Sequence, residues 1–273
     1  MCCEVLNNVI LEAQIDEFFH LHSMANIAKY RCGAVESVEE GALTNDLILM
    51  EGFMDNLKTT LSNVWTAIVQ IFHEIKEIIT KAVKTIYYKI KSWVTKNDDT
   101  VEFSTFVYDT PQELITKITN NCNECQKMFD VWDKLYKSND IPTENDISAF
   151  EFNGHKLETT TDNEGNFNIE SPSVRNKSKY SFSSSKAFKF RPSDAVKFSE
   201  QLDKTSKVIA KLESRAKNNC RVKIDNDYVK TRYMSTIALF IAKCISEYIY
   251  DDYEEALNLL YKMNEEINKN GNA

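Results

Sequence analysis

The chain has 273 residues, of which 42% are hydrophobic and 27% are charged, and its formal net charge is −8. This apolar content excludes a wholly disordered chain, and only 6 glycines and 4 prolines exclude collagen-like and turn-dense all-β architectures. No run of about 18 uncharged apolar residues occurs, so the sequence predicts no membrane-spanning helix. We expect a mainly α fold in which long amphipathic helices pack as an irregular bundle, with a small antiparallel β meander.

The excess negative charge is concentrated in residues 1–51. This segment has nine acidic and two basic residues, a net charge of −7, whereas the rest of the chain carries 32 acidic and 31 basic residues. Residues 3–31 have the apolar spacing of an amphipathic helix, and residues 32–52 contain three glycines and little periodicity, which indicates a flexible acidic connector. We therefore treat 1–51 as a separate N-terminal segment, which is either a removable propeptide or a solvated helix with its connector.

Residues 52–98 are expected to form one long amphipathic helix. Apolar residues recur from Leu57 to Trp93 with an average spacing of about 3.6 residues, the period of a straight helix, and the opposite side is rich in lysine. A helix over 53–95 would be about 65 Å long. Its wide apolar stripe has to be covered by the chain's own core, by a partner helix or by a membrane surface.

The remaining residues, 99–273, predict a mainly helical body. Thr110 is expected to be the N-cap of a helix over 111–138, with a proline at its first position. A second proline begins a helix that runs from residue 192 to about residue 215. A last, largely apolar helical region is expected from about residue 228 to residue 269.

The β structure is expected to be local. Residues 99–109 are compatible with one strand, and Asn153–Gly154 between two apolar stretches predicts a tight hairpin. A second turn at 162–165 extends this hairpin, so the sequence predicts a small β meander near 148–191.

No motif supplies a catalytic, cofactor-binding or metal site. The patterns GxxxxGK[ST], GxGxxG and GxSxG do not occur in the sequence. Cys122 and Cys125 have a metal-like spacing, but no second cysteine pair or nearby histidine pair completes a set of four ligands. The seven cysteines are irregularly spaced and no secretion signal precedes them, so we expect reduced thiols. The sequence therefore predicts a non-enzymatic protein without a cofactor or a metal.

A basic segment near residues 172–191 alternates cationic with aromatic residues. Cationic groups neutralise phosphates and aromatic rings stack on bases, so one interpretation is a nucleic-acid contact. The other is an edge hairpin whose rings face the core and whose lysines face water, and the alternation favours it. The nucleic-acid candidates are Arg175, Lys177, Lys179, Lys186, Lys189 and Arg191.

A short pattern, Leu49, Glu51 and Gly52, stands at the end of the acidic segment and directly before the long helix. In this layout the chain resembles the virion structural proteins of large tailed bacteriophages that are processed during head maturation. Their prohead protease cuts after Glu in patterns such as Leu-x-Glu followed by Gly. The resemblance implies cleavage after Glu51 and removal of the acidic piece, which leaves a nearly neutral product that packs beside DNA with less repulsion.

Two functions are compatible with these patterns. The resemblance implies a non-enzymatic virion structural protein, made in the cytoplasm of a bacterial host and located in the virion as an internal head protein. Its partners would be other virion proteins of the capsid or core, and packaged DNA. The alternative is a membrane-surface or membrane-active protein that acts through the basic amphipathic helix 53–95, where Trp65 and Trp93 suit an interface.

Overall fold

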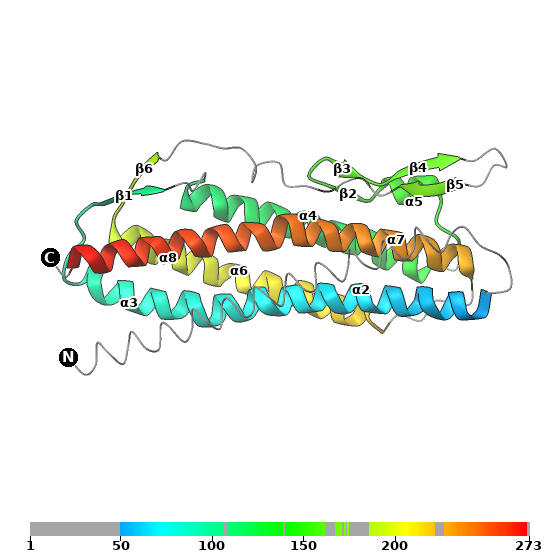
Figure 1. Ribbon diagram of the computed structural model, residues 1–273, viewed down its shortest axis with the longest axis horizontal. Coiled ribbons are helices and arrows are strands. Elements are labelled where there is room, and N and C mark those ends of the chain that lie inside the picture. Colours follow the sequence, from blue (N-terminus) through cyan, green and yellow to red (C-terminus); the bar gives the residue numbers. More distant parts are fainter. Residues whose placement is uncertain are drawn as a thin grey trace.

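The structure is a computed structural model, and it is predominantly helical with three short two-stranded sheets among the residues that it describes (Figure 1). The expected mainly α bundle with a small β element is confirmed. Residues 1–49 lie outside the described part, so the expectations for the acidic segment stay predictions. The described residues are 50–105, 109–138, 140–161, 167–170, 172, 174, 186–221 and 227–271.

The first long rod consists of helix α2 (Met50–Ile78), a π-helical segment η2 (Ile79–Val83) and helix α3 (Lys84–Val94). It begins two residues before the expected start and ends four residues before the expected end of the 52–98 helix. Glu51 and Gly52 therefore lie in the first turn of α2 and not in the extended connector that the sequence suggested.

The apolar stripe of this rod is covered by the chain itself. The expected core positions from residue 61 to residue 90 are buried, with Ala82 and Trp93 partly buried against the same core. The described part of α2 packs mainly against α6 (Pro192–Asn219) and α7 (Tyr228–Cys244). The buried members are Leu61, Val64, Trp65, Ile68, Ile71, Phe72, Ile75, Ile78, Ile79, Val83, Ile86 and Ile90.

The second long rod confirms the predicted last helical region. It consists of α7, the π-helical segment η4 (Ile245–Tyr250) and α8 (Asp251–Gly271). Figure 1 shows this rod lying alongside the first and running in the same direction, from the blue and orange ends toward the cyan and red ends. Two parallel rods require long connections, and these connections supply the other helices and the strands.

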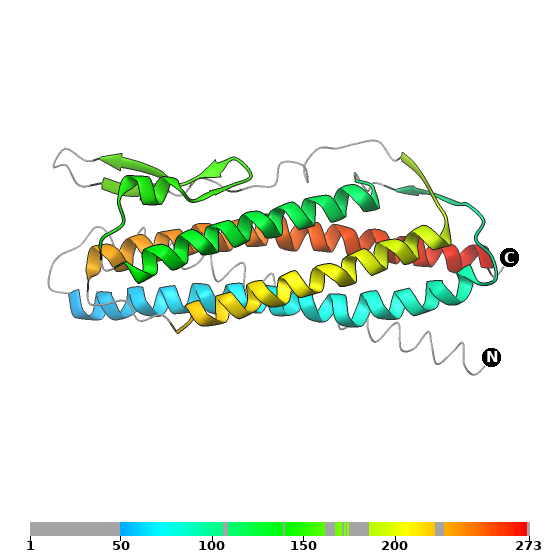
Figure 2. The same ribbon diagram turned by 180° about the vertical axis from the view of Figure 1, so that it is seen from behind.

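Helix α4 (Pro111–Lys137) and helix α6 run in the opposite direction and complete the bundle (Figure 2). The predicted cap of α4 is confirmed: the Glu113 backbone N–H donates to the Thr110 hydroxyl, and the Thr110 N–H donates to the Glu113 carboxylate. Helix α6 begins at the expected proline and continues four residues beyond the expected end.

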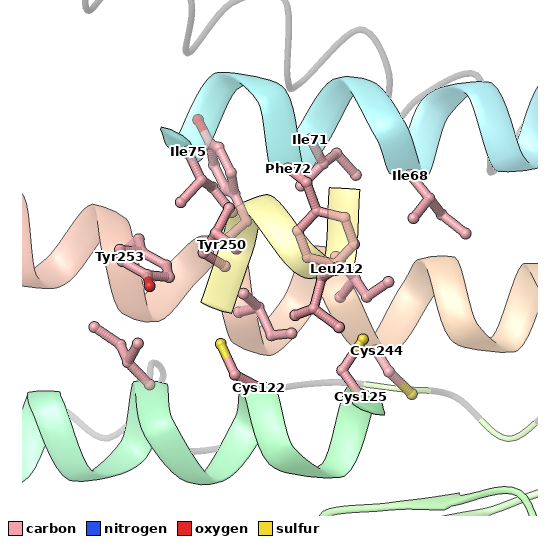
Figure 3. Packing of buried hydrophobic residues seen from close by; sticks show 14 of the residues in the cluster. Ile68, Ile71, Phe72, Ile75, Cys122, Cys125, Leu212, Cys244, Tyr250 and Tyr253 are labelled. Carbon is pink, nitrogen blue, oxygen red and sulfur yellow. The ribbon is translucent and has the colours of Figure 1, made fainter. Parts of the chain in front are cut away.

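The centre of the bundle is an aromatic cluster. Trp65 of α2 packs edge-on against Trp132 and Phe129 of α4, with ring centroids 4.8 and 5.4 Å apart. In Figure 3, Phe72 of α2 and Leu212 of α6 point into the same interior as residues of α4. The three helices are therefore joined by one continuous apolar core.

The predicted hairpin is present as strands β2 (Glu151–Phe152) and β3 (His155–Lys156). Asn153 and Gly154 have φ angles of 48° and 78°, the left-handed values that a two-residue hairpin turn requires. The hairpin follows the short helix α5 (Glu144–Ser148). The next two strands, β4 (Glu158–Thr161) and β5 (Phe167–Glu170), also pair antiparallel, as the second predicted turn implies.

The last strand of the predicted meander has a different partner. Strand β6 (Lys186–Phe190) pairs with β1 (Val101–Thr105), the single strand expected within 99–109. The expectation of one continuous meander to residue 191 was therefore wrong. The physical reason is an aromatic cluster: the Phe103 ring lies 5.3 Å from that of Phe188 and 5.8 Å from that of Phe190.

Candidate functional site

A buried polar network joins the β2–β3 hairpin to the bundle. The Asn121 side chain on α4 donates from Nδ2 to Asp252 Oδ2 at 2.5 Å. Asn153, in the hairpin turn, donates from Nδ2 to Asn121 Oδ1 at 2.7 Å. The buried Asn121 amide thus donates a hydrogen bond to α8 and accepts one from the hairpin. It joins α4, α8 and the β2–β3 hairpin, which are distant from one another in the sequence.

A second polar contact holds the same hairpin. The His155 Nε2 atom lies 2.7 Å from the Tyr248 hydroxyl, and the Tyr248 ring packs 5.4 Å from the buried ring of Phe152. Tyr248 belongs to the π-helical segment η4, and such segments are frequent at functional sites because they redirect side chains. The hairpin is therefore held by the ring contacts of Phe152 and His155 with Tyr248 and by two hydrogen-bonded contacts.

The charge of Asp252 depends on pH near neutrality. Its carboxyl is 2% exposed, and burial raises its pKa to about 7, against the opposing effects of the Asn121 hydrogen bond and the Lys117 charge. Lys117 is paired with Asp109, just before the start of α4. Two further carboxyls, Glu255 and Asp251, add to the rise in the Asp252 pKa.

A second buried carboxyl lies on the first rod. Glu74 is 3% exposed, and burial raises its pKa to about 7 while a hydrogen bond with Gln70 lowers it. Its Oε2 atom has no hydrogen-bond partner among the described residues. Tyr250 of η4 reaches toward α2 (Figure 3), and burial, followed by the charges of Glu254 and Glu74, raises the pKa of its phenol. The two rods thus each carry one carboxyl that can hold a proton in the interior.

The Asn121 amide gives a sharp test of this network. We expect Asn121→Ala to lower the free energy of unfolding by about 1–3 kcal/mol, because Asp252 and Asn153 both lose a partner. Asn120→Ala is the matched control, since Asn120 is the preceding residue on α4 and is exposed. Urea denaturation checks both variants, and an equal effect of the two substitutions would contradict the role assigned to Asn121.

Three of the four described cysteines are buried free thiols, and the fourth, Cys220, is a half-buried one. Cys122 and Cys125 on α4 and Cys244 on α7 lie in the interior (Figure 3). Burial is the largest cause that raises the pKa of Cys122, to about 12, so this thiol stays protonated and unreactive at neutral pH. Among the described residues, no three His, Cys, Asp or Glu side chains are placed to hold a metal ion.

The predicted processing residues lie at the edge of the described chain. Leu49 is outside the described residues, and Glu51 and Gly52 belong to the first turn of α2. The first four backbone N–H groups of a helix have no intrahelical partner, so this turn frays most easily. Cleavage after Glu51 therefore requires that only the end of α2 unwinds.

The six nucleic-acid candidates are not brought together as one described surface. Arg175, Lys177 and Lys179 lie outside the described residues. The backbone of Lys186 pairs with that of Thr105. Lys189 is exposed, and its Nζ atom lies 3.1 Å from a carboxylate oxygen of Glu102.

Within β6, the rings pack inward and the described lysine faces water, as the edge-strand interpretation expects. Phe190 is buried and Phe188 is partly buried against the core, whereas Lys189 between them is exposed. Arg191, the last candidate, is the exposed N-cap residue of α6. The alternation of this strand is therefore accounted for by the fold, without a nucleic-acid contact.

The buried network has a signal in the sequence. Asp251 and Asp252 are adjacent on a helix, and adjacent residues on a helix do not oppose each other across a cleft. Helical phase, however, places Asp252 on the same stripe as the buried Ile249, Ala256 and Leu259. A carboxyl at such a position is expected to be buried and to need a polar partner from another element.

Comparisons with known proteins give no relative: no family model, no curated protein and no solved structure matches this chain. None of the helices in the described ranges combines the length and the apolar character needed to cross a membrane.

Proposed function

We propose that this chain is a non-enzymatic structural protein of the virion of a large tailed bacteriophage, associated with the head and cleaved after Glu51 during maturation. The supporting observation is a coincidence of two sequence boundaries. The excess negative charge ends at residue 51, and the Leu49-x-Glu51-Gly52 pattern occupies the same place. Its partners are other capsid or core proteins and packaged DNA.

The bundle is compatible with the loss of residues 1–51. Among the described side chains, the first buried residue of α2 is Leu61, several turns after the cleavage bond. The core that the structure describes is formed by α2, α3, α4, α6, α7 and α8. Cleavage after Glu51 is expected to remove a net charge of −7.

The membrane-surface alternative receives no support from this fold. It needs an uncovered apolar face on the helix over 53–95, but that face is buried from Leu61 to Ile90. Trp65, one of its two proposed interfacial residues, is 0% exposed and packs against Trp132. Trp93 is partly buried, with the Lys96 ammonium over its ring.

Sedimentation tests the proposed location. Particles of the virus that encodes this chain, purified on a density gradient, are expected to contain the chain after a high-salt wash. A non-structural protein of the same virus is the control for contamination. Recovery of the chain only in the membrane fraction or the soluble fraction of the infected cell would contradict a virion role.

A further inference from the structure

An exposed basic surface lies along the contact between the first rod and α6. These helices run antiparallel and side by side in both views (Figures 1 and 2). Two contacts fix their register: Lys76 Nζ lies 2.6 Å from Glu213 Oε2, and the Tyr87 hydroxyl lies 3.4 Å from Glu200 Oε1. Besides Lys81, which pairs with Glu77, the exposed lysines between these contacts are Lys84 on α3 and Lys204, Lys207 and Lys211 on α6.

The sequence of both helices is strongly basic here. Residues 78–97 contain five lysines and no acidic residue, and residues 204–221 contain six basic residues and one acidic residue. That acidic residue is Glu213, which is buried and lies within 2.6 Å of the ammonium groups of Lys76 and Lys217. The acidic groups beside the surface are Glu77, which pairs with Lys81, and Glu200 and Asp203.

The four lysines are not neutralised within the described part of the chain. No described carboxylate oxygen lies within 4.0 Å of the ammonium groups of Lys84, Lys204, Lys207 and Lys211. Their positive charge suits the binding of a polyanion. Such a row of exposed ammonium groups repels itself until a polyanion binds.

An aromatic residue stands among these lysines. Tyr88 is 68% exposed, the highest exposure of a large hydrophobic residue among the described residues. Helical spacing places Lys84 one turn before it and Lys91 one turn after it. Lys91 is held in place by Tyr87, whose hydroxyl lies 2.8 Å from Nζ and whose ring centroid lies 5.0 Å from it.

The surface suits a nucleic acid better than a membrane. Insertion into a bilayer surface needs a contiguous apolar face, but Ile86 and Ile90 of α3 are buried. Tyr88, whose ring contacts that of the half-buried Tyr87, is the one exposed large apolar residue described on α3. Lysine ammonium groups bind phosphates as point charges and release the counterions of DNA. The exposed chemistry is therefore that of a phosphate-binding surface.

We propose that the α3–α6 basic surface, formed by Lys84, Lys91, Lys204, Lys207 and Lys211 with Tyr88, binds the phosphate backbone of duplex DNA without sequence preference. The inference rests on the proposed function, which supplies packaged DNA as the available polyanion. It assigns the DNA contact to two packed helices of the bundle and not to the basic segment near 172–191.

Fluorescence anisotropy of the full chain with a labelled duplex of about 30 base pairs, between about 50 and 200 mM salt, tests this proposal. The variant K84Q/K204Q/K207Q/K211Q is expected to bind at least about 10-fold more weakly at the lowest salt. The slope of its log affinity against log salt concentration is expected to be smaller in magnitude by about three to four, because about that many fewer counterions are released. The matched control is K127Q/K134Q/K137Q/K156Q, which removes the same charge from exposed lysines of α4 and the hairpin. This control is expected to keep its affinity within about two-fold. Circular dichroism establishes that both variants keep their helices.

Three outcomes would overturn the proposal. The first is no duplex binding by the unmodified chain at the lowest salt, and the second is an equal loss of affinity in the two variants. The third is binding to phosphatidylserine vesicles, lost in K84Q/K204Q/K207Q/K211Q, without binding to the duplex, because the partner is then a membrane. Each outcome leaves virion association, measured by sedimentation, as a separate question.

Discussion

Replacing Trp132 with alanine is expected to lower the free energy of unfolding by about 3–5 kcal/mol. Trp132 is 0% exposed, and its ring centroid lies 4.8 Å from that of Trp65, so it joins α4 to the first rod. Removal of the ring leaves a cavity that Phe129 and the aliphatic residues around it fill only in part. Guanidinium denaturation followed by circular dichroism measures the loss.

Two further variants separate packing from other effects. Trp132→Phe is expected to cost clearly less than Trp132→Ala, because it keeps most of the ring and removes an indole N–H that has no partner among the described residues. Tyr88→Ala, at the exposed ring of α3, is expected to change the stability by less than about 0.5 kcal/mol. If Trp132→Ala and Tyr88→Ala were equally mild, the aromatic cluster would not be the centre of the core.

The free energy of unfolding is expected to fall as the pH rises from about 4 to about 7. Burial raises the pKa of Glu74 and of Asp252 to about 7, so the folded chain binds two protons that the unfolded chain releases near pH 4. The stability that these protons contribute is complete below the unfolded pKa values and is lost as the pH passes the folded ones. Each carboxyl contributes on the order of 3 kcal/mol to this loss.

Glu213 acts in the opposite direction at lower pH. Burial alone would raise its pKa, but the hydrogen bonds from Lys217 and Lys76 are stronger in sum and leave the pKa lowered. The stability that Glu213 contributes is present above its unfolded pKa and is lost as the pH falls through its folded pKa. The two effects together predict a stability maximum near pH 4, where the fall toward neutral pH begins.

Amide variants identify the groups responsible for the loss at neutral pH. Asp252→Asn and Glu74→Gln are each expected to flatten the profile between about pH 5 and pH 8, and to make the chain more stable than the unmodified protein at the upper end. Asp99→Asn, at an exposed carboxyl, is the control and is expected to keep the original profile. A stability that rises steadily to pH 8 in the unmodified chain would contradict the assignment.

The helices could be predicted from the sequence because their signals are local. The period of the apolar stripe in α2 and α3, the Thr110 cap and the prolines at positions 111 and 192 each act within a few residues. The turn at Asn153–Gly154 is equally local, because two consecutive left-handed residues are needed. Such features predict an element before any tertiary contact is known.

The pairings between distant residues could not be predicted in the same way. Strand β6 follows the hairpins in the sequence, yet its partner β1 lies before α4, and only the packing of three phenylalanine rings selects it. The contact between Asn121 and Asp252 depends on how α4 crosses the second rod. The π-helical segments η2 and η4 each redirect a few side chains without changing the average apolar period, so the sequence pattern does not show them.

The N-terminal residue of the particle-associated chain tests the maturation account most directly. N-terminal sequencing of the chain recovered from purified mature particles is expected to begin at Gly52, and Glu51→Gln is expected to retain the acidic segment while Glu39→Gln is processed normally. A particle-associated chain that still begins at Met1 would contradict cleavage after Glu51.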